Sequence, residues 1–123
     1  MRDRPRLVKP IHRHPVLGVE LSRDAEHGRA LLYGELDMAS TDWLRTVLEQ
    51  VRQDGCRYLV LDLRHLRFLG VTGLEAIVQI AGEYAEAGGQ ITLIRPTRTV
   101  RRILELTGLN DHLALAERSE WPP

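Results

Sequence analysis

Apolar residues follow a strand-like pattern in four segments of the chain. Two of these segments flank the polar, turn-like Asp24–Gly28 and are predicted to pair as a hairpin. The third reads YLVLDL and is apolar on both faces, as expected for a strand that is covered on both sides. A short apolar stretch follows this strand, and we interpret it as part of a connector. It contains Leu66, Phe68 and Leu69. The predicted strands span residues 16–21, 30–34, 58–63 and 91–94.

A first helix is predicted to follow the second strand. Ser40, Thr41 and Asp42 are its N-cap candidates, and Gly55 marks its predicted end. Apolar residues recur at helical spacing along one face of this segment. They are Leu44, Val47, Leu48 and Val51.

Two further helices are predicted, one after each of the last two strands. The second helix opens at Thr72, and the third is capped by Thr97 or Thr99. Gly108 suits the C-cap of the third helix, because glycine adopts a left-handed conformation without strain. Beyond it, Leu113–Ala116 is expected to add an edge strand or a final turn.

Strands that alternate with helices require crossover connections, which place helices against a parallel or mixed sheet. The predicted fold class is therefore α/β, a small mixed sheet packed against about three to four helices. With 123 residues, the chain is long enough for one domain with a single core. We expect this domain to span residues 15–118, after a basic, poorly ordered extension (1–14) and before a short stub (119–123).

Charge and cysteine content narrow the class of protein. Seventeen basic and seventeen acidic side chains balance, so no net field draws the chain to nucleic acid or to a membrane surface. No apolar stretch is long enough to span a bilayer, and the N-terminal residues lack the apolar core of a signal peptide. Cys56 is the one cysteine, which fits a reducing cytoplasm and a small buried side chain. We expect a cytoplasmic protein.

Sequence motifs for catalysis or cofactor binding are lacking. The chain has no phosphate-binding loop, no dinucleotide-binding glycine motif and no HExxH. Glu35 and Asp37 stand two apart at the end of the second strand, and we do not interpret them as an acid/base pair. His12 and His14 have no downstream ligands that would complete a metal site. We expect a protein that is not an enzyme and binds no metal or cofactor.

Thr72 stands out because its hydroxyl lies at the predicted start of the second helix. Backbone N–H groups point outward at a helix N-terminus, and the helix dipole favours negative charge there. Such a position suits phosphorylation. The structural alternative is a hydroxyl that caps the first turn, a contribution of roughly 1 kcal/mol. The two roles are compatible.

Four short motifs occur in a characteristic order along the chain: GELD before the first helix, then LVLDL, FLGVTGL and finally LELTGL. Together they resemble the STAS domain, and more specifically its anti-anti-sigma factor branch in bacteria. The resemblance covers roughly residues 16–118, which is nearly the whole predicted domain.

The resemblance implies a switchable binding protein. Its partner would be a kinase of the histidine-kinase-like ATPase class that also acts as an anti-sigma factor, so that binding frees a sigma factor. Phosphorylation of Thr72 by that kinase would end binding, and a phosphatase would restore it. Phosphate adds close to two negative charges, and each 1.4 kcal/mol of penalty at an interface weakens affinity about tenfold.

The acceptor motif departs from the family's pattern, which is typically an apolar pair followed by Asp, Ser, Ser or Thr, Gly and Leu. Here Gly70 stands at the Asp position and Val71 at the first Ser position. An aspartate could orient the acceptor hydroxyl, whereas Gly70 instead permits close backbone approach. The expected partner-binding residues are Asp37, Trp43, Gly70, Val71, Thr72 and Gly73.

Alternatives remain open at two of these residues and for the function itself. Asp37 would contact the kinase, or it would end a strand by accepting hydrogen bonds from loop N–H groups. Trp43, two residues into the predicted helix, is either an exposed anchor for a partner or a side chain packed at the helix base. The other functions are a non-switched STAS scaffold in a stress-sensing complex, a small partner of a lipid-transport ATPase, and nucleotide binding without phosphotransfer.

Overall fold

One mixed β-sheet organises the protein. The computed structural model describes residues 11–108 and 113–117, and within them six strands pair in the order β1-β2-β3-β4-β5-β6. β1, β2 and β3 are antiparallel neighbours, whereas β3 to β6 run parallel. The strands are β1 (Ile11–Arg13), β2 (Leu17–Asp24), β3 (His27–Leu36), β4 (Tyr58–Leu69), β5 (Gln90–Ile94) and β6 (Leu113–Ala116). The helices are α1 (Met38–Gln53), α2 (Val71–Glu86) and α3 (Arg98–Thr107). The predicted α/β class is confirmed.

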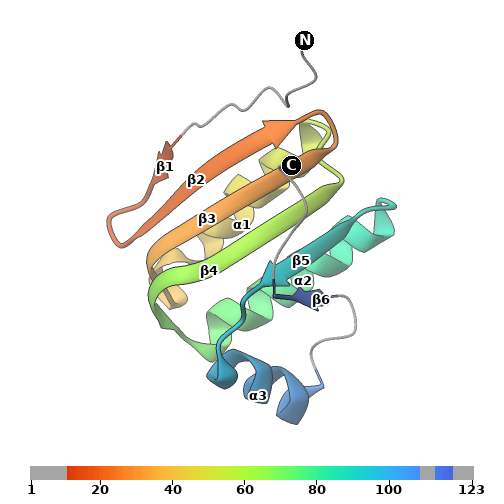
Figure 1. The fold of residues 1–123 in the computed structure, drawn as a ribbon. Coiled ribbons are helices and arrows are strands. Elements are labelled where there is room, and N and C mark those ends of the chain that lie inside the picture. Colours follow the sequence, from red (N-terminus) through yellow and green to blue (C-terminus); the bar gives the residue numbers. More distant parts are fainter. Residues whose placement is uncertain (1–10, 109–112, 118–123) are drawn as a thin grey trace.

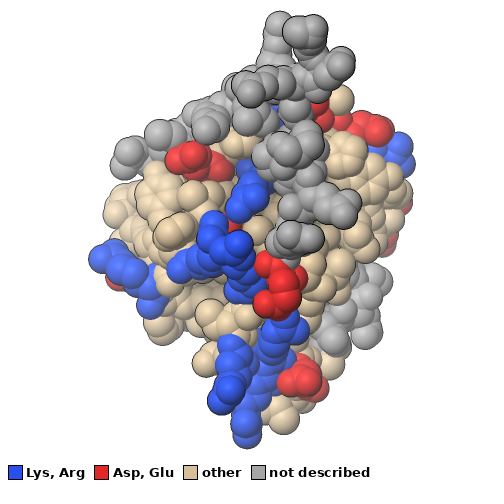
Figure 2. Space-filling view, viewed as in Figure 1, with Lys and Arg blue, Asp and Glu red and all other residues tan. Residues whose placement is uncertain are grey.

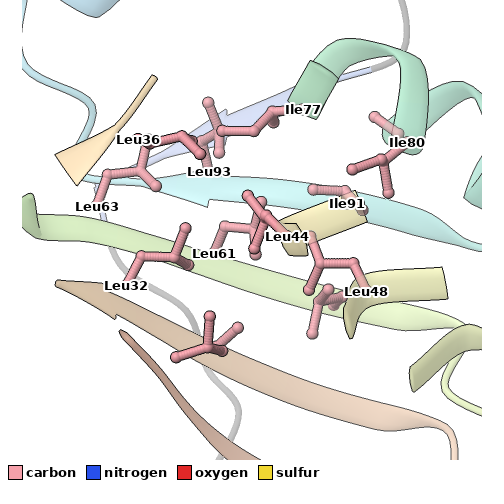
Figure 3. Close-up of a cluster of buried hydrophobic side chains, with 14 of the residues drawn as sticks. Leu32, Leu36, Leu44, Leu48, Leu61, Leu63, Ile77, Ile80, Ile91 and Leu93 are labelled. Carbon is pink, nitrogen blue, oxygen red and sulfur yellow. The ribbon is translucent and has the colours of Figure 1, made fainter. Parts of the chain in front are cut away.

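The core lies between the sheet and two helices. α1 and α2 lie side by side behind the sheet, while α3 lies below it (Figure 1). Leucine and isoleucine side chains from both layers interdigitate (Figure 3). Burial of each such side chain stabilises the fold by about 1.5–3 kcal/mol, so this layer contact holds the two helices on the sheet. Its largest fully buried members include Leu32, Leu36, Leu44, Leu48, Leu61, Ile77, Ile80 and Ile91.

The predicted hairpin is confirmed, and its strands are longer than expected. β2 continues to Asp24 and β3 begins at His27, so only Ala25 and Glu26 form the turn. Ala25 has φ 53°, the positive value that two-residue hairpin turns require. The additional residues at the strand ends are mostly polar, so the apolar pattern of the sequence did not indicate that they belong to the strands.

The N-terminal extension differs from the prediction in part. Ile11–Arg13, which we expected within a poorly ordered extension, form β1 and pair antiparallel with Gly18–Glu20 of β2. Backbone hydrogen bonding to β2 explains why these residues form a strand, because such bonding is largely independent of side-chain type. The rest of the predicted extension (1–10) and the predicted stub (119–123) lie outside the described residues.

Sequence signals at the end of the chain are confirmed. Thr97 is the N-cap of α3, with its hydroxyl oxygen 3.2 Å from the Val100 backbone nitrogen that donates to it. Gly108 is the C-cap, with a left-handed φ of 67°. Leu113–Ala116 is an edge strand rather than a final turn, and it pairs with β5 in parallel.

β4 differs most from the prediction. It continues without a connector to Leu69, whereas the sequence pattern ended the strand at Leu63. Two register shifts against β3 each insert one extra residue into β4. Each such bulge changes which face the next residues occupy, so Leu66 and Leu69 pack against the core at three-residue spacing. That spacing is the reason why the segment was mistaken for a connector.

Candidate functional site

Two helices begin side by side at the carboxyl ends of β3 and β4. Leu36 and Leu69 are register partners at these ends, and the Gly70 N–H donates to the Leu36 carbonyl oxygen at 3.1 Å. The next residues, Asp37 and Gly70, are the N-caps of α1 and α2. The parallel pairing of β3 and β4 thus brings together residues that lie more than thirty positions apart in the chain.

The N-terminus of α1 is closed by hydrogen bonds from its own residues. An Asp37 carboxylate oxygen accepts from the Ala39 N–H at 3.0 Å, and the Ser40 hydroxyl accepts from the Asp37 N–H at 3.2 Å. The Ser40 hydroxyl also donates to the Glu35 carbonyl oxygen at 2.9 Å. The prediction of Ser40, Thr41 or Asp42 as the N-cap is therefore wrong. Helical backbone starts three residues earlier, because Asp37 and Ser40 form a reciprocal capping box.

This arrangement matches the structural alternative for Asp37, a carboxylate that ends a strand and accepts a hydrogen bond from a backbone N–H. Its partner-binding role remains a prediction. Trp43 lies deeper in α1 than predicted, as the sixth helical residue. Its ring is half-buried against the core and lies 5.6 Å from the His14 ring. This contact matches the structural alternative, a side chain packed at the helix base, and the partner-binding role of Trp43 remains a prediction.

The N-terminus of α2 has no equivalent closure. Gly70 has no side chain that could cap it, and the first amides of a helix have no intrahelical acceptors. Thr72 is the second helical residue, and its side chain is exposed. Among the described residues, none forms a hydrogen bond with the Thr72 hydroxyl. Thr72 is therefore not an N-cap, and its hydroxyl is open to an incoming group.

Gly73 determines how Thr72 is presented. Gly73 is buried where α2 approaches the end of β3, and a Cβ atom there would lie 2.7 Å from Leu36 Cγ. The helix therefore rests on the sheet at Gly73, while its preceding residues, Val71 and Thr72, face solvent. The predicted residues Asp37, Gly70, Val71, Thr72 and Gly73 thus share one edge of the fold.

Large apolar side chains are exposed at this edge. Met38 at the start of α1 is 80% exposed, and Phe68 and Val71 before and within the start of α2 are each 52% exposed. We refer to these three residues as the apolar rim. The sequence pattern did not indicate Met38 and Phe68 as site residues, because their exposure depends on where α1 begins and on the bulges in β4.

A buried ion-pair cluster supports the strand that leads to Thr72. Asp62 is fully buried on β4, where its carboxylate accepts hydrogen bonds from the Arg29 guanidinium at 2.9 Å and from Arg64 at 2.8 Å. It also accepts from the Arg64 backbone N–H at 3.1 Å, next to the first bulge. Arg64 therefore holds the bulged part of β4 in place through Asp62.

The charge of Asp62 is stabilised by its partners. Burial raises the pKa of the Asp62 carboxyl, but hydrogen bonds from the Arg64 side chain and backbone and from Arg29 outweigh burial. The pKa therefore lies below its ordinary value, and the carboxylate is ionised at neutral pH. The sequence pattern did not indicate this role, because Asp62 lies inside an otherwise apolar strand.

Two further features limit the chemistry of the described residues. Within residues 11–108 and 113–117, no three His, Cys, Asp or Glu side chains are grouped so that they could hold a metal ion. No helix in that part of the chain is both long and apolar enough to cross a bilayer. Thr72, its open helix N-terminus and the apolar rim form the candidate site.

Comparison with known proteins finds relatives named as anti-sigma factor antagonists. The chain is 26% identical over 104 residues to an anti-sigma-B factor antagonist of Staphylococcus aureus (strain NCTC 8325 / PS 47), covering 85% of this chain and 96% of the relative. It is 28% identical over 96 residues to an anti-sigma F factor antagonist of Paenibacillus polymyxa, covering 74% and 82%.

The fold agrees with this relationship. The solved structure of the Bacillus cell fate determinant SpoIIAA in its phosphorylated form is similar, with a TM-score of 0.65 and 20% identity. This similarity covers 83% of this chain and 92% of the other. Residues 31–120 match the STAS domain, and the chain therefore belongs to the STAS domain family.

Proposed function

We propose that this chain is an anti-sigma factor antagonist, which binds an anti-sigma serine/threonine kinase and thereby frees a sigma factor. Phosphorylation of Thr72 by that kinase ends the binding. One observation carries the proposal: an exposed threonine hydroxyl lies in the first turn of α2, with no hydrogen-bond partner among the described residues. The names of the two bacterial relatives support the same function.

The apolar rim favours a protein as the partner. Met38, Phe68 and Val71 expose large apolar side chains at the edge that carries Thr72. Buried apolar and aromatic side chains supply most of the binding energy at the centre of protein interfaces. Gly70 and Val71 replace the family's polar residues, so docking at this edge depends on apolar contact and backbone approach.

Phosphate on Thr72 would act on the interface more than on the fold. The outward-pointing amides and the dipole of α2 favour a negative charge at this position, so the helix tolerates the group. A docked partner, in contrast, would bury two added charges against the apolar rim. Desolvation of those charges costs several kcal/mol, which is enough to release the partner.

The partner and a phosphatase carry the chemistry in this proposal, and the chain itself is a substrate. The kinase belongs to the histidine-kinase-like ATPase class, and a phosphatase that removes phosphate from Thr72 restores binding. Cytoplasmic location follows from such partners. No catalytic role is assigned to the chain.

The test measures binding with variants of Thr72. Thr72→Ala and Thr72→Asp baits are used for affinity capture from the native host's lysate, and the captured kinase is then purified and titrated against each bait. We expect retention by the alanine variant and loss with the aspartate variant. Thr46→Asp, which adds the same charge at an exposed position of α1, should bind like the unchanged protein.

A non-switched STAS scaffold is the second candidate. Gly70 and Val71 favour it, because they remove two polar neighbours of the acceptor. Equal retention of one partner by the alanine and aspartate baits would support this candidate and overturn the switch. Capture of a stress-sensing complex or of a lipid-transport ATPase would distinguish its two forms.

A further inference from the structure

α3 carries an exposed row of side chains that the proposed function does not use. Arg98, Arg102 and Leu106 are spaced four residues apart, so they lie one above the other along one face of the helix. All three are exposed, and the Leu106 side chain is 75% exposed. We call these three residues the α3 ridge.

The rest of α3 is engaged within the domain. Val100 and Leu104 are buried at 5% and 0% exposure, and Arg101 forms an ion pair with Glu117 beside β6. Arg98 and Arg102, in contrast, form no ion pair with any described residue. Their charges and the exposed Leu106 side chain are therefore available to a partner.

The charges on this side of the molecule are mostly basic. Basic side chains gather over the open face of the sheet and continue down over α3 (Figure 2). Glu105 is the acidic residue on α3 itself, three positions after Arg102. Although the whole chain is electrically neutral, this surface is complementary to an acidic one.

The position of α3 relates the ridge to the candidate site. β3, β4 and β5 run parallel, so α1, α2 and α3 all follow carboxyl ends on the same edge of the sheet. The start of α2 and the whole of α3 lie on the lower side of the molecule (Figure 1). One partner of ordinary interface size, about 800 Å² per side, can therefore reach both.

We propose that the α3 ridge is a second docking surface for the anti-sigma kinase, and that it fits an acidic-rimmed apolar pocket on that partner. The inference rests on the proposed function. The two guanidinium groups provide bidentate donors for carboxylates, and Leu106 provides an apolar side chain for the pocket. Leucine neither stacks on bases nor reads their edges, so the ridge favours a protein over a nucleic acid.

The test is titration of the purified kinase into the full-length chain at two salt concentrations. Arg98→Glu/Arg102→Glu should weaken binding about tenfold or more, equivalent to about 1.4 kcal/mol, and should flatten the salt dependence. Leu106→Ser should weaken binding several-fold and leave the salt dependence unchanged. Arg57→Glu reverses one charge at an exposed arginine before the start of β4, away from the ridge, and should bind normally.

The possible results separate the two proposals. Absence of binding by the unchanged chain overturns both the proposed function and the ridge. Normal affinity and salt dependence in all ridge variants, with binding still abolished by Thr72→Asp, overturns the ridge alone. Stronger binding to a DNA duplex than to the kinase, dependent on the arginines and not on Leu106, also overturns it. Thermal melts of each variant confirm folding, which these exposed positions should not disturb.

Discussion

Gly73 and Leu36 are in such close contact that no side chain fits between them. A Cβ atom on Gly73 would lie 2.7 Å from Leu36 Cγ and 3.0 Å from the Leu36 carbonyl oxygen. Because real Cβ atoms do not approach other atoms so closely, a larger residue would push α2 away from β3. This contact fixes the distance between the start of α2 and the end of β3, and hence the position of Thr72.

Gly73→Ala is therefore expected to destabilise the protein by about 1–3 kcal/mol, the usual cost of overpacking a tight contact. Urea unfolding followed by circular dichroism measures this loss. Gly70→Ser, three residues earlier, is the control, because Gly70 has an extended φ of −86° and a serine there can cap the helix. Equal stability of the two variants would show that α2 can shift without cost.

Gly70→Asp should stabilise α2. The N-cap has extended backbone and no side-chain hydrogen bond, so an aspartate could accept from the open amides and interact favourably with the helix dipole. The expected gain is about 0.5–1 kcal/mol, measured by urea unfolding. If the kinase proposal holds, the new carboxylate also orients the Thr72 hydroxyl, and phosphate incorporation becomes faster. Lower stability would show that the nearby Phe68 ring cannot move aside.

The two threonines at helix starts should respond differently to removal of the hydroxyl. Thr97→Ala loses the cap bond to the Val100 N–H and should cost about 1 kcal/mol. Thr72→Ala loses no hydrogen bond to a described residue and should stay within about 0.5 kcal/mol of the unchanged protein. Paired thermal melts provide the comparison. A large loss at Thr72 would mean that its hydroxyl supports the fold after all.

Asp62→Asn should remove the negative charge that pairs with Arg29 and Arg64 and thereby destabilise the protein. The expected loss at neutral pH is about 2–3 kcal/mol, below that of a fully buried pair because Arg29 and Arg64 reach solvent. The pKa of the Asp62 carboxyl is depressed in the folded state, so its stabilisation is complete above the unfolded pKa of about 3.9. It is lost as the pH falls through the lower, folded pKa.

The difference in stability between the unchanged protein and Asp62→Asn should accordingly be constant from pH 7 to about pH 5 and shrink in acid below about pH 4. Unfolding free energies measured in urea across that range test the sign. A difference that grows in acid would contradict the ionised, arginine-bound carboxylate.

Cys56 should react slowly in the native state. Its side chain is buried, and burial raises the pKa of the thiol to about 11, so little thiolate exists at pH 8. Alkylation by iodoacetamide should therefore be slow in buffer and fast in urea, with mass spectrometry as the readout. Fast labelling under native conditions would show that the region around Cys56 opens locally.

Local sequence signals predicted much of the fold. The Thr97 cap and the Gly108 C-cap depend on a few neighbouring residues and the backbone between them, so they were predictable. The alternation of strands and helices follows in the same way from apolar spacing. Thr72 was singled out for the same reason, since a hydroxyl beside the glycine that opens a helical segment is a local pattern.

Long-range contacts explain two of the errors, and competition between neighbouring residues explains the third. The start of α1 is set by a capping box between Asp37 and Ser40, which competes locally with the caps predicted at Ser40, Thr41 and Asp42. The second half of β4 is a strand because its bulges pair with β3, more than thirty residues away. Asp62 holds a buried ion-pair cluster together because Arg29, on the neighbouring strand β3, forms an ion pair with it.

The sequence by itself determined the α/β class and the placement of a threonine hydroxyl at the start of α2. Only the tertiary structure decided that Thr72 is exposed and uncapped, that Asp37 and Gly70 lie side by side, and that Met38 and Phe68 form a rim around them. The physical reason is that helix and strand formation depends on neighbours in the chain. Exposure and proximity at the site depend instead on the register of parallel strands, which no local pattern specifies.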